Sequence, residues 1–153
     1  CGIREFGFNA LLSLRLEKGF GIWSAEFTQG YTPGMTGMDR WIDWEKEQFI
    51  GQAAAIKERD GNGPAQKLVM LEIDADDADA SGYEPVWNND SLVGFVTSGG
   101  YGHTLKKSLA MALVNNDLAN ENQRLKVHVV GVEKDATVIQ ASPYDPEGKV
   151  MRV

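Results

Sequence analysis

The stretch KLVMLEID, residues 67–74, decides the fold class of this chain. Its apolar side chains alternate between two faces in period two, with Leu68 and Met70 opposite Val69, Leu71 and Ile73. Period two is the repeat of a β-strand, whose successive side chains point to opposite faces. The stretch therefore predicts a strand.

Further short apolar segments follow this strand along the chain. Leu92–Thr97 is a continuous apolar run, Arg124–Glu133 alternates in period two, and Ala136–Ala141 is predicted as a final strand. Short strands separated by turn residues are typical of a small antiparallel barrel or sandwich.

Residues 98–114 allow more than one interpretation. Ser98–His103 contains three glycines, which favours a hairpin-like connection or, alternatively, a loop that lines a pocket with Tyr101 and His103 facing it. The pattern of Leu105–Val114 by itself favours a helix, because three apolar side chains fall in helical register: Leu105, Leu109 and Ala112.

The N-terminal part is predicted to be helical with breaks. An amphipathic helix that stops at Lys18-Gly19 is indicated by apolar residues three or four apart, namely Ile3, Phe6, Ala10 and Leu14. A structured loop with a turn at Thr32-Pro33-Gly34 follows. A second helix is predicted from Glu47 to Arg59, with a buried face formed by Phe49, Ala53 and Ile56. The cluster Asp60–Pro64 ends it and predicts a boundary between residues 1–62 and 63–153.

Composition excludes several classes of protein. The net charge is −7 over 153 residues, which argues against a general nucleic-acid binder because such a protein needs a basic face to neutralise phosphates. No segment approaches the roughly 18–20 apolar residues of a membrane span. The single cysteine, Cys1, excludes internal disulfides and cysteine zinc sites, and we predict no metal site. Because the first residue is not Met, we expect a piece of a longer protein.

Few residues stand out as candidates for chemistry. Arg15 is either a surface arginine near a helix end or a fork that binds a ligand carboxylate. Trp41 and Trp44, three residues apart, are more typical of a core or subdomain interface than of a stacking platform. Nothing places Ser98 within reach of His103, so we predict no catalytic residue. On these grounds alone the chain is a mixed α and β domain without an assigned function.

Five segments together resemble one family. They are SLRLEKGF (13–20), the Thr-Pro turn (32–37), FIGQAA (49–54), VGFVTSG (93–99) and LKKSLAMALV (105–114). In this order they resemble the folate-dependent aminomethyltransferases, the family of the glycine cleavage T-protein. The sequence of three segments is more similar to the C-terminal region of the dimethylglycine and sarcosine dehydrogenases than to the free T-protein. These segments are residues 13–23, 100–114 and 142–152.

The resemblance implies an α+β architecture. Family members have three subdomains around a central hole where tetrahydrofolate binds. Residues 1–62 would be the end of the middle, α/β folate-binding subdomain, and residues 63–153 the C-terminal six-stranded antiparallel β-barrel. The resemblance also implies a strand at Leu109–Val114, against the helical pattern noted above.

The resemblance further implies chemistry. In relatives, a one-carbon unit from a methylated amine passes to tetrahydrofolate, and in the dehydrogenases a flavin (FAD) domain oxidises the amine first. The matching catalytic carboxylate and flavin region lie outside this chain, so we expect the fragment alone to be inactive. Arg15 matches the family arginine that binds the folate tail. Trp41 follows Arg40, which stands where relatives often have an aromatic residue near folate, and Tyr101 and His103 are further candidates.

Two alternatives remain open: a non-catalytic folate-binding or scaffold module, and a related tetrahydrofolate-dependent demethylase that takes methyl groups from sulfur or oxygen donors. The expected partners are a folate and the N-terminal subdomains of the same parent chain, without nucleic acid or membrane. We also expect the fragment to self-associate through apolar faces that those subdomains would cover. The expected location is the cytoplasm, or the mitochondrial matrix in a eukaryote.

Overall fold

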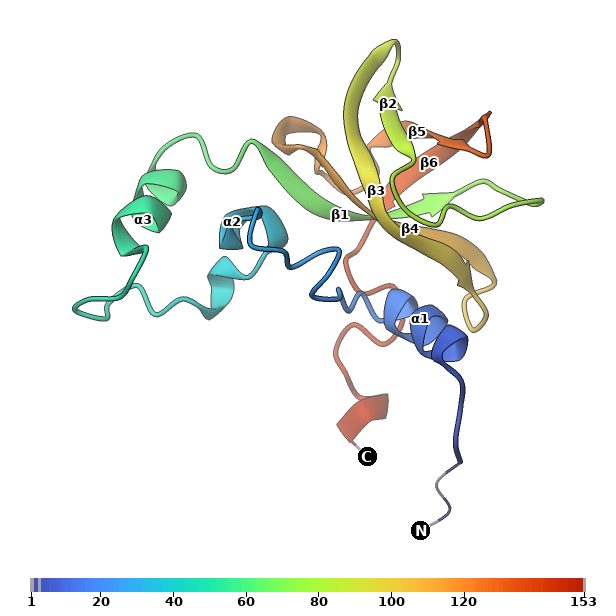
Figure 1. Cartoon of the computed structure of the whole chain (residues 1–153), viewed down its shortest axis with the longest axis horizontal. Coiled ribbons are helices and arrows are strands. Elements are labelled where there is room, and N and C mark those ends of the chain that lie inside the picture. The colour runs from blue at the N-terminus through green and yellow to red at the C-terminus, as the bar shows by residue number, and fades with distance from the viewer. Residues whose placement is uncertain (1, 3, 153) are drawn as a thin grey trace.

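The centre of the molecule is a closed barrel. The computed structural model describes residues 2 and 4–152. Six antiparallel strands close the barrel in the order β1-β4-β3-β2-β5-β6 (Figure 1). Their bounds are Gln66–Ile73 (β1), Pro85–Asn88 (β2), Ser91–Gly102 (β3), Lys107–Asn115 (β4), Arg124–Val129 (β5) and Val132–Ile139 (β6). The six-stranded barrel implied by the resemblance is therefore confirmed.

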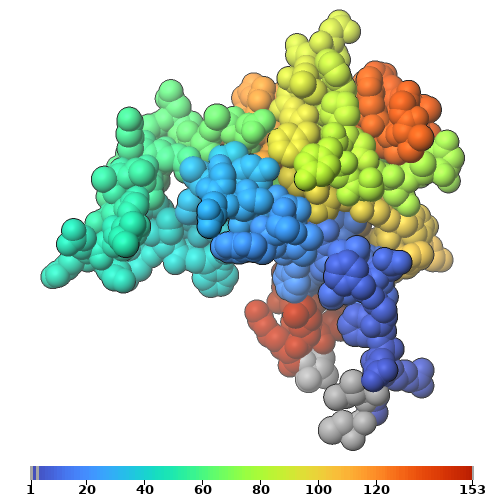
Figure 2. Space-filling model, viewed as in Figure 1, coloured from blue at the N-terminus to red at the C-terminus, as the bar shows by residue number. Residues whose placement is uncertain are grey.

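The α-helices lie outside the barrel wall. The α-helices are Phe8–Glu17 (α1), Pro33–Thr36 (α2) and Gln52–Asp60 (α3), and the 3-10 helices are Asp39–Trp41 (η1), Asn116–Leu118 (η2) and Val150–Arg152 (η3). Helix α1 packs on β3 and β4. The segment from α2 to α3 extends as an arm beside β1, coloured cyan to green in Figures 1 and 2.

Two apolar clusters bury both faces of β1 and β4. The barrel interior is filled by small or branched side chains, among them Val69, Leu71, Ala110, Ala112 and Val127. Outside the wall, a second cluster joins α1 to the same two strands through Leu16, Met70, Leu109 and Met111. Complete burial of a Val, Leu or Met side chain in these clusters contributes about 1.5–3 kcal/mol. The second cluster anchors α1 to the barrel.

The burial of both faces explains why the pattern of residues 105–114 is misleading. Residues 108–114 of β4 are all buried, so the strand reads as a continuous apolar run without polar alternation. Such a run matches a helical register as well as a strand. The pairing Leu68↔Leu113 and its neighbours along β1 show that the segment is a strand, as the resemblance implied, and the helical prediction is wrong.

The glycine-rich segment is also a strand. Ser98–Gly102 continues β3, and the turn comes after it, so the predicted hairpin-like connection at Ser98–His103 is wrong. The glycines serve close backbone approach: a Cβ on Gly99 would lie 2.3 Å from the carbonyl oxygen of Ala80, and one on Gly94 would lie 2.0 Å from that of Leu113. Sequence pattern cannot distinguish this use of glycine from a turn.

The predicted buried face of the first helix is wrong. Phe6, Ala10 and Leu14 are exposed, whereas Leu16 and Glu17 are the buried residues of α1; Ile3 lies outside the described residues. The predicted stop is confirmed, since Gly19 follows the helix with φ +72°. The side of α1 that faces the barrel is set by its contact with Met70 and Met111 rather than by its own apolar spacing.

The second predicted helix is shorter than expected. Helix α3 begins at Gln52 rather than Glu47, and Ala53 on its predicted buried face is exposed. Its main packing partner among the described residues is the four-residue helix α2, which is too small to bury a whole apolar face. The predicted turn at Thr32-Pro33-Gly34 is the start of α2, where the Oγ1 of Thr32 accepts a hydrogen bond from the N–H of Met35 at 3.3 Å.

Two strand assignments change as well. The predicted strand Arg124–Glu133 is interrupted by a tight turn at Val130-Gly131, whose φ angles are +50° and +78°, so it comprises β5 and the start of β6. Strand β2 was not predicted. It has only four residues and no alternating run of its own.

Candidate functional site

The C-terminal half of α1 is joined to the barrel by polar contacts. The hydroxyl of Ser13 donates to the carbonyl oxygen of Tyr101 at 2.8 Å. One turn later, Oε1 of Glu17 accepts the N–H groups of Thr104 and Leu105 at 2.6 and 2.8 Å. Residues four apart share a helix face, so this face of α1 holds the β3–β4 turn.

The C-terminal segment is attached to the end of the same helix. Tyr144 donates its N–H to the carbonyl oxygen of Glu17 at 2.9 Å. The ammonium of Lys18 contacts the backbone oxygen and, at 3.4 Å, the carboxylate of Asp145. Burial by itself would raise the pKa of the Asp145 carboxyl, but the N–H groups of Val150 and Lys149 and the charge of Lys18 outweigh it, and the pKa lies below its ordinary value.

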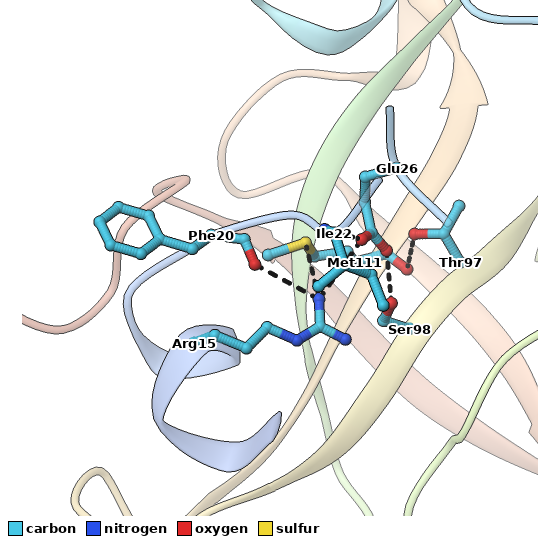
Figure 3. Close-up of polar contacts among 7 residues, drawn as sticks. All are labelled: Arg15, Phe20, Ile22, Glu26, Thr97, Ser98 and Met111. Carbon is cyan, nitrogen blue, oxygen red and sulfur yellow. Dashed lines mark hydrogen bonds and ion pairs between the residues drawn. The ribbon is translucent and has the colours of Figure 1, made fainter. Parts of the chain in front are cut away.

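Arg15 lies on α1 between Ser13 and Glu17, the two residues that contact the end of β3 and the turn after it. Its side chain is only 10% exposed. Three contacts converge on Nη1: the carboxylate Oε2 of Glu26 at 3.3 Å, the carbonyl oxygen of Phe20 at 3.4 Å and Sδ of Met111 at 3.9 Å (Figure 3). Arg15 is thus fixed through one end of its guanidinium.

Glu26 supplies the charge that opposes Arg15. It is fully buried. Its Oε2 also accepts the N–H of Ile22 at 2.8 Å, and its Oε1 accepts the hydroxyl of Ser98 on β3 (Figure 3). A buried carboxylate is tolerated when an opposite charge and hydrogen bonds satisfy it, and Glu26 has both.

The other edge of the Arg15 guanidinium is unpartnered rather than exposed. Its Nε is buried, and no residue among 2 and 4–152 hydrogen-bonds to it. Nε and Nη2 present two parallel N–H groups, the geometry that a carboxylate accepts in a bidentate pair. Arg15 also lines a groove of about 300 Å³ whose walls are largely apolar but include the charged residues Glu17 and Lys18. The other lining residues are Leu11, Leu14, Phe20, Thr104, Tyr144 and Met151. The arrangement suits a carboxylate attached to an apolar body.

The structure brings two other predicted site residues together. Tyr101 near the end of β3 and His103 in the following turn stack edge to face, with ring centroids 5.1 Å apart. Both are exposed. Because Ser13 contacts the backbone of Tyr101, this pair lies beside α1, the helix that carries Arg15.

Trp41 lies elsewhere. It belongs to η1 in the arm between α2 and α3, is 73% exposed, and has the guanidinium of Arg40 over its ring at 5.5 Å. Trp41 is therefore not a core residue. Trp44 is half-buried beneath the guanidinium of Arg59 at 4.5 Å. The structure does not bring Trp41 together with Arg15.

Glu26 was missed by the sequence analysis, and Ser98 was considered only as a nucleophile. A signal for Glu26 exists: it is the only charged residue in the aromatic-rich segment 20–31. Within the described ranges, no three His, Cys, Asp or Glu side chains converge as a metal site, and no helix there combines the length and apolarity needed to cross a bilayer.

Comparison with known proteins identifies the family. Residues 66–145 match the family model described as the glycine cleavage T-protein C-terminal barrel domain. Mitochondrial dimethylglycine dehydrogenase of Rattus norvegicus is 37% identical over 91% of this chain, and the aminomethyltransferase of a Synechocystis strain is 33% identical over 97%. The crystal structure of glycine cleavage system aminomethyltransferase T from Bartonella henselae superposes with a TM-score of 0.83 at 26% identity, over 92% of this chain.

The matches cover only part of these relatives: 16% of the dehydrogenase, 40% of the Synechocystis aminomethyltransferase and 39% of the Bartonella chain. The family model nevertheless spans more than half of the 153 residues. This chain belongs to the glycine cleavage T-protein family, whose C-terminal barrel domain it contains.

Proposed function

We propose that this chain is the C-terminal part of a tetrahydrofolate-dependent aminomethyltransferase module, in a parent protein that resembles dimethylglycine or sarcosine dehydrogenase. In that parent, a one-carbon unit from a methylated amine passes to tetrahydrofolate. The names of the relatives support the reaction class. The observation that carries the proposal is the unpartnered Nε of Arg15 beside a largely apolar groove, because folate combines carboxylates with an aromatic body.

The part that this chain plays is binding. Tetrahydrofolate, when bound, supplies the amine that takes up the one-carbon unit. Arg15 holds a folate carboxylate through Nε and Nη2, while Leu14 and Phe20 keep water from the aromatic portion. Tyr101 and His103 remain predicted contacts on the same side of the barrel, and Trp41 a predicted contact from the arm. The transfer step and any FAD belong to other parts of the parent.

The proposal is tested by calorimetric titration with 5-formyltetrahydrofolate, a stable reduced folate, using this chain and the full-length parent. We expect micromolar binding that Arg15→Lys weakens at least about tenfold, because lysine offers a point charge without the bidentate fork. Arg124→Lys, an exposed arginine at the start of β5, is the matched control and should bind as the wild type. Absence of binding to the full-length wild type would refute the proposal and favour a scaffold role.

The reaction class and location are tested on the parent. Product analysis with N-methyl and S-methyl donors separates an amine substrate from a sulfur donor, the alternative of a related demethylase. We propose a cytoplasmic location, or the mitochondrial matrix in a eukaryote, which the name of the rat relative supports. Fractionation of cells with an antibody against the barrel checks this.

A further inference from the structure

We propose that Glu26 is a positioning residue that directs the unpartnered edge of Arg15, Nε and Nη2, toward the ligand carboxylate. This inference rests on the proposed folate site and goes beyond it by naming the residue that orients the arginine. Glu26 comes from the loop between α1 and α2, eleven residues after Arg15.

Glu26 is held in place on three sides. Its Oε2 lies 3.3 Å from Nη1 of Arg15 and 2.8 Å from the backbone nitrogen of Ile22, and its Oε1 accepts the hydroxyl of Ser98. No part of Glu26 is exposed. It thus links the arginine on α1 to the barrel wall at β3.

This attachment decides which donors of Arg15 are left. Nη1 carries two N–H groups, and Glu26 and the carbonyl of Phe20 are its oxygen acceptors. The guanidinium is planar and rigid, so fixing Nη1 also fixes the direction of Nε and Nη2. Buried ion pairs seldom add net stability relative to apolar residues, which makes orientation of the arginine the better explanation for a carboxylate at this position.

The test compares three variants by titration with 5-formyltetrahydrofolate. Glu26→Gln keeps the shape and an acceptor but removes the charge, and we expect about tenfold weaker binding, because a neutral hydrogen bond is roughly half as strong as a charged one. Ser98→Ala removes only the donor to Oε1 and should weaken binding by a smaller factor. In an Arg15→Lys background, Glu26→Gln should cause less than about a twofold further loss, since the two residues act as one unit.

A second readout does not depend on the ligand. The Nε–H resonance of Arg15, assigned by its loss in Arg15→Lys, should exchange slowly in the wild type and in Glu121→Gln, an exposed control. It should exchange faster in Glu26→Gln, or in Ser98→Ala if Glu26→Gln does not fold. Unchanged exchange together with wild-type affinity in these variants would overturn the positioning role alone. Absence of folate binding by the full-length wild type would overturn the proposed function, and the ligand role of Glu26 with it.

Discussion

Glu17 illustrates at the residue scale how one buried side chain joins two parts of the chain. It is adjacent to Leu16, and both are 1% exposed, although one is charged and the other apolar. Its carboxylate accepts two backbone N–H groups at the β3–β4 turn, 87 and 88 residues further along the chain. Spacing within α1 contains no information about such partners, so the sequence analysis did not identify this role of Glu17.

We expect Glu17→Ala to lower the melting temperature markedly. The substitution removes two hydrogen bonds to a carboxylate that is only 1% exposed, and a hydrogen bond to a charged group contributes about 1.5–3 kcal/mol. Thermal unfolding followed by circular dichroism measures the change, with the exposed Glu5→Ala as the control. Equal melting temperatures for the two variants would contradict this role of Glu17.

At the scale of elements, β3 depends on glycines where it passes close to other backbone segments. A Cβ on Gly99 would lie 2.3 Å from a backbone oxygen that cannot move independently, whereas one on Gly7, at the start of α1, meets nothing within 4 Å. The two positions therefore separate glycines that the fold needs from glycines that it tolerates.

Gly99→Ala should destabilise the protein by about 1–3 kcal/mol, the usual cost of overpacking, and Gly7→Ala should be close to neutral. Chemical denaturation of both variants gives the two free energies of unfolding. A Gly99→Ala variant as stable as the wild type would show that β3 can move away from Ala80 at little cost.

The attachment of the C-terminal segment to α1 should depend on pH. Backbone N–H groups and Lys18 hold the pKa of Asp145 below its ordinary value against the opposing effect of burial. A carboxyl with a lowered folded-state pKa contributes stability above its unfolded value of about 3.9, and that contribution is lost as the pH falls through the folded pKa. Asp145→Asn should therefore lower the melting temperature at pH 7.

The difference between wild type and Asp145→Asn should shrink as the pH drops below about 4. Melting curves from pH 7 to pH 2.5 measure it, and the exposed Asp90→Asn serves as the control, with no pH-dependent difference expected. A constant difference across this range would mean that the charge of Asp145 is not what holds the segment.

At the scale of the whole molecule, apolar side chains remain exposed around α1. Phe6, Phe8, Leu11, Leu14 and Phe20 are between 44% and 70% exposed. Clusters of exposed apolar side chains of this kind usually mark contact surfaces.

We therefore expect the isolated chain to self-associate as its concentration rises, and Phe8→Lys to reduce the association. Sedimentation velocity over a hundredfold concentration range measures it. Leu92→Lys, which replaces an exposed leucine of β3, is the matched control and should associate as the wild type does. A monodisperse monomer at all concentrations would count against this prediction.

Local pattern by itself determined the strands Gln66–Ile73 and Arg124–Val129 approximately and the glycine stop after α1, because period two and a left-handed glycine are properties of neighbouring residues. The resemblance added the number of strands and the strand at Leu109–Val114. Arg15 was identified as a candidate, but its partner was not.

Only the tertiary structure decided which face of α1 is buried, that Ser98–Gly102 is a strand, and that Arg15 pairs with Glu26. Each depends on a contact between segments that are not neighbours in the chain, up to 96 residues apart for Arg15 and Met111. The periodicity of a segment shows which apolar side chains it could bury. Which of them are buried depends on the segments that pack against it in the folded protein.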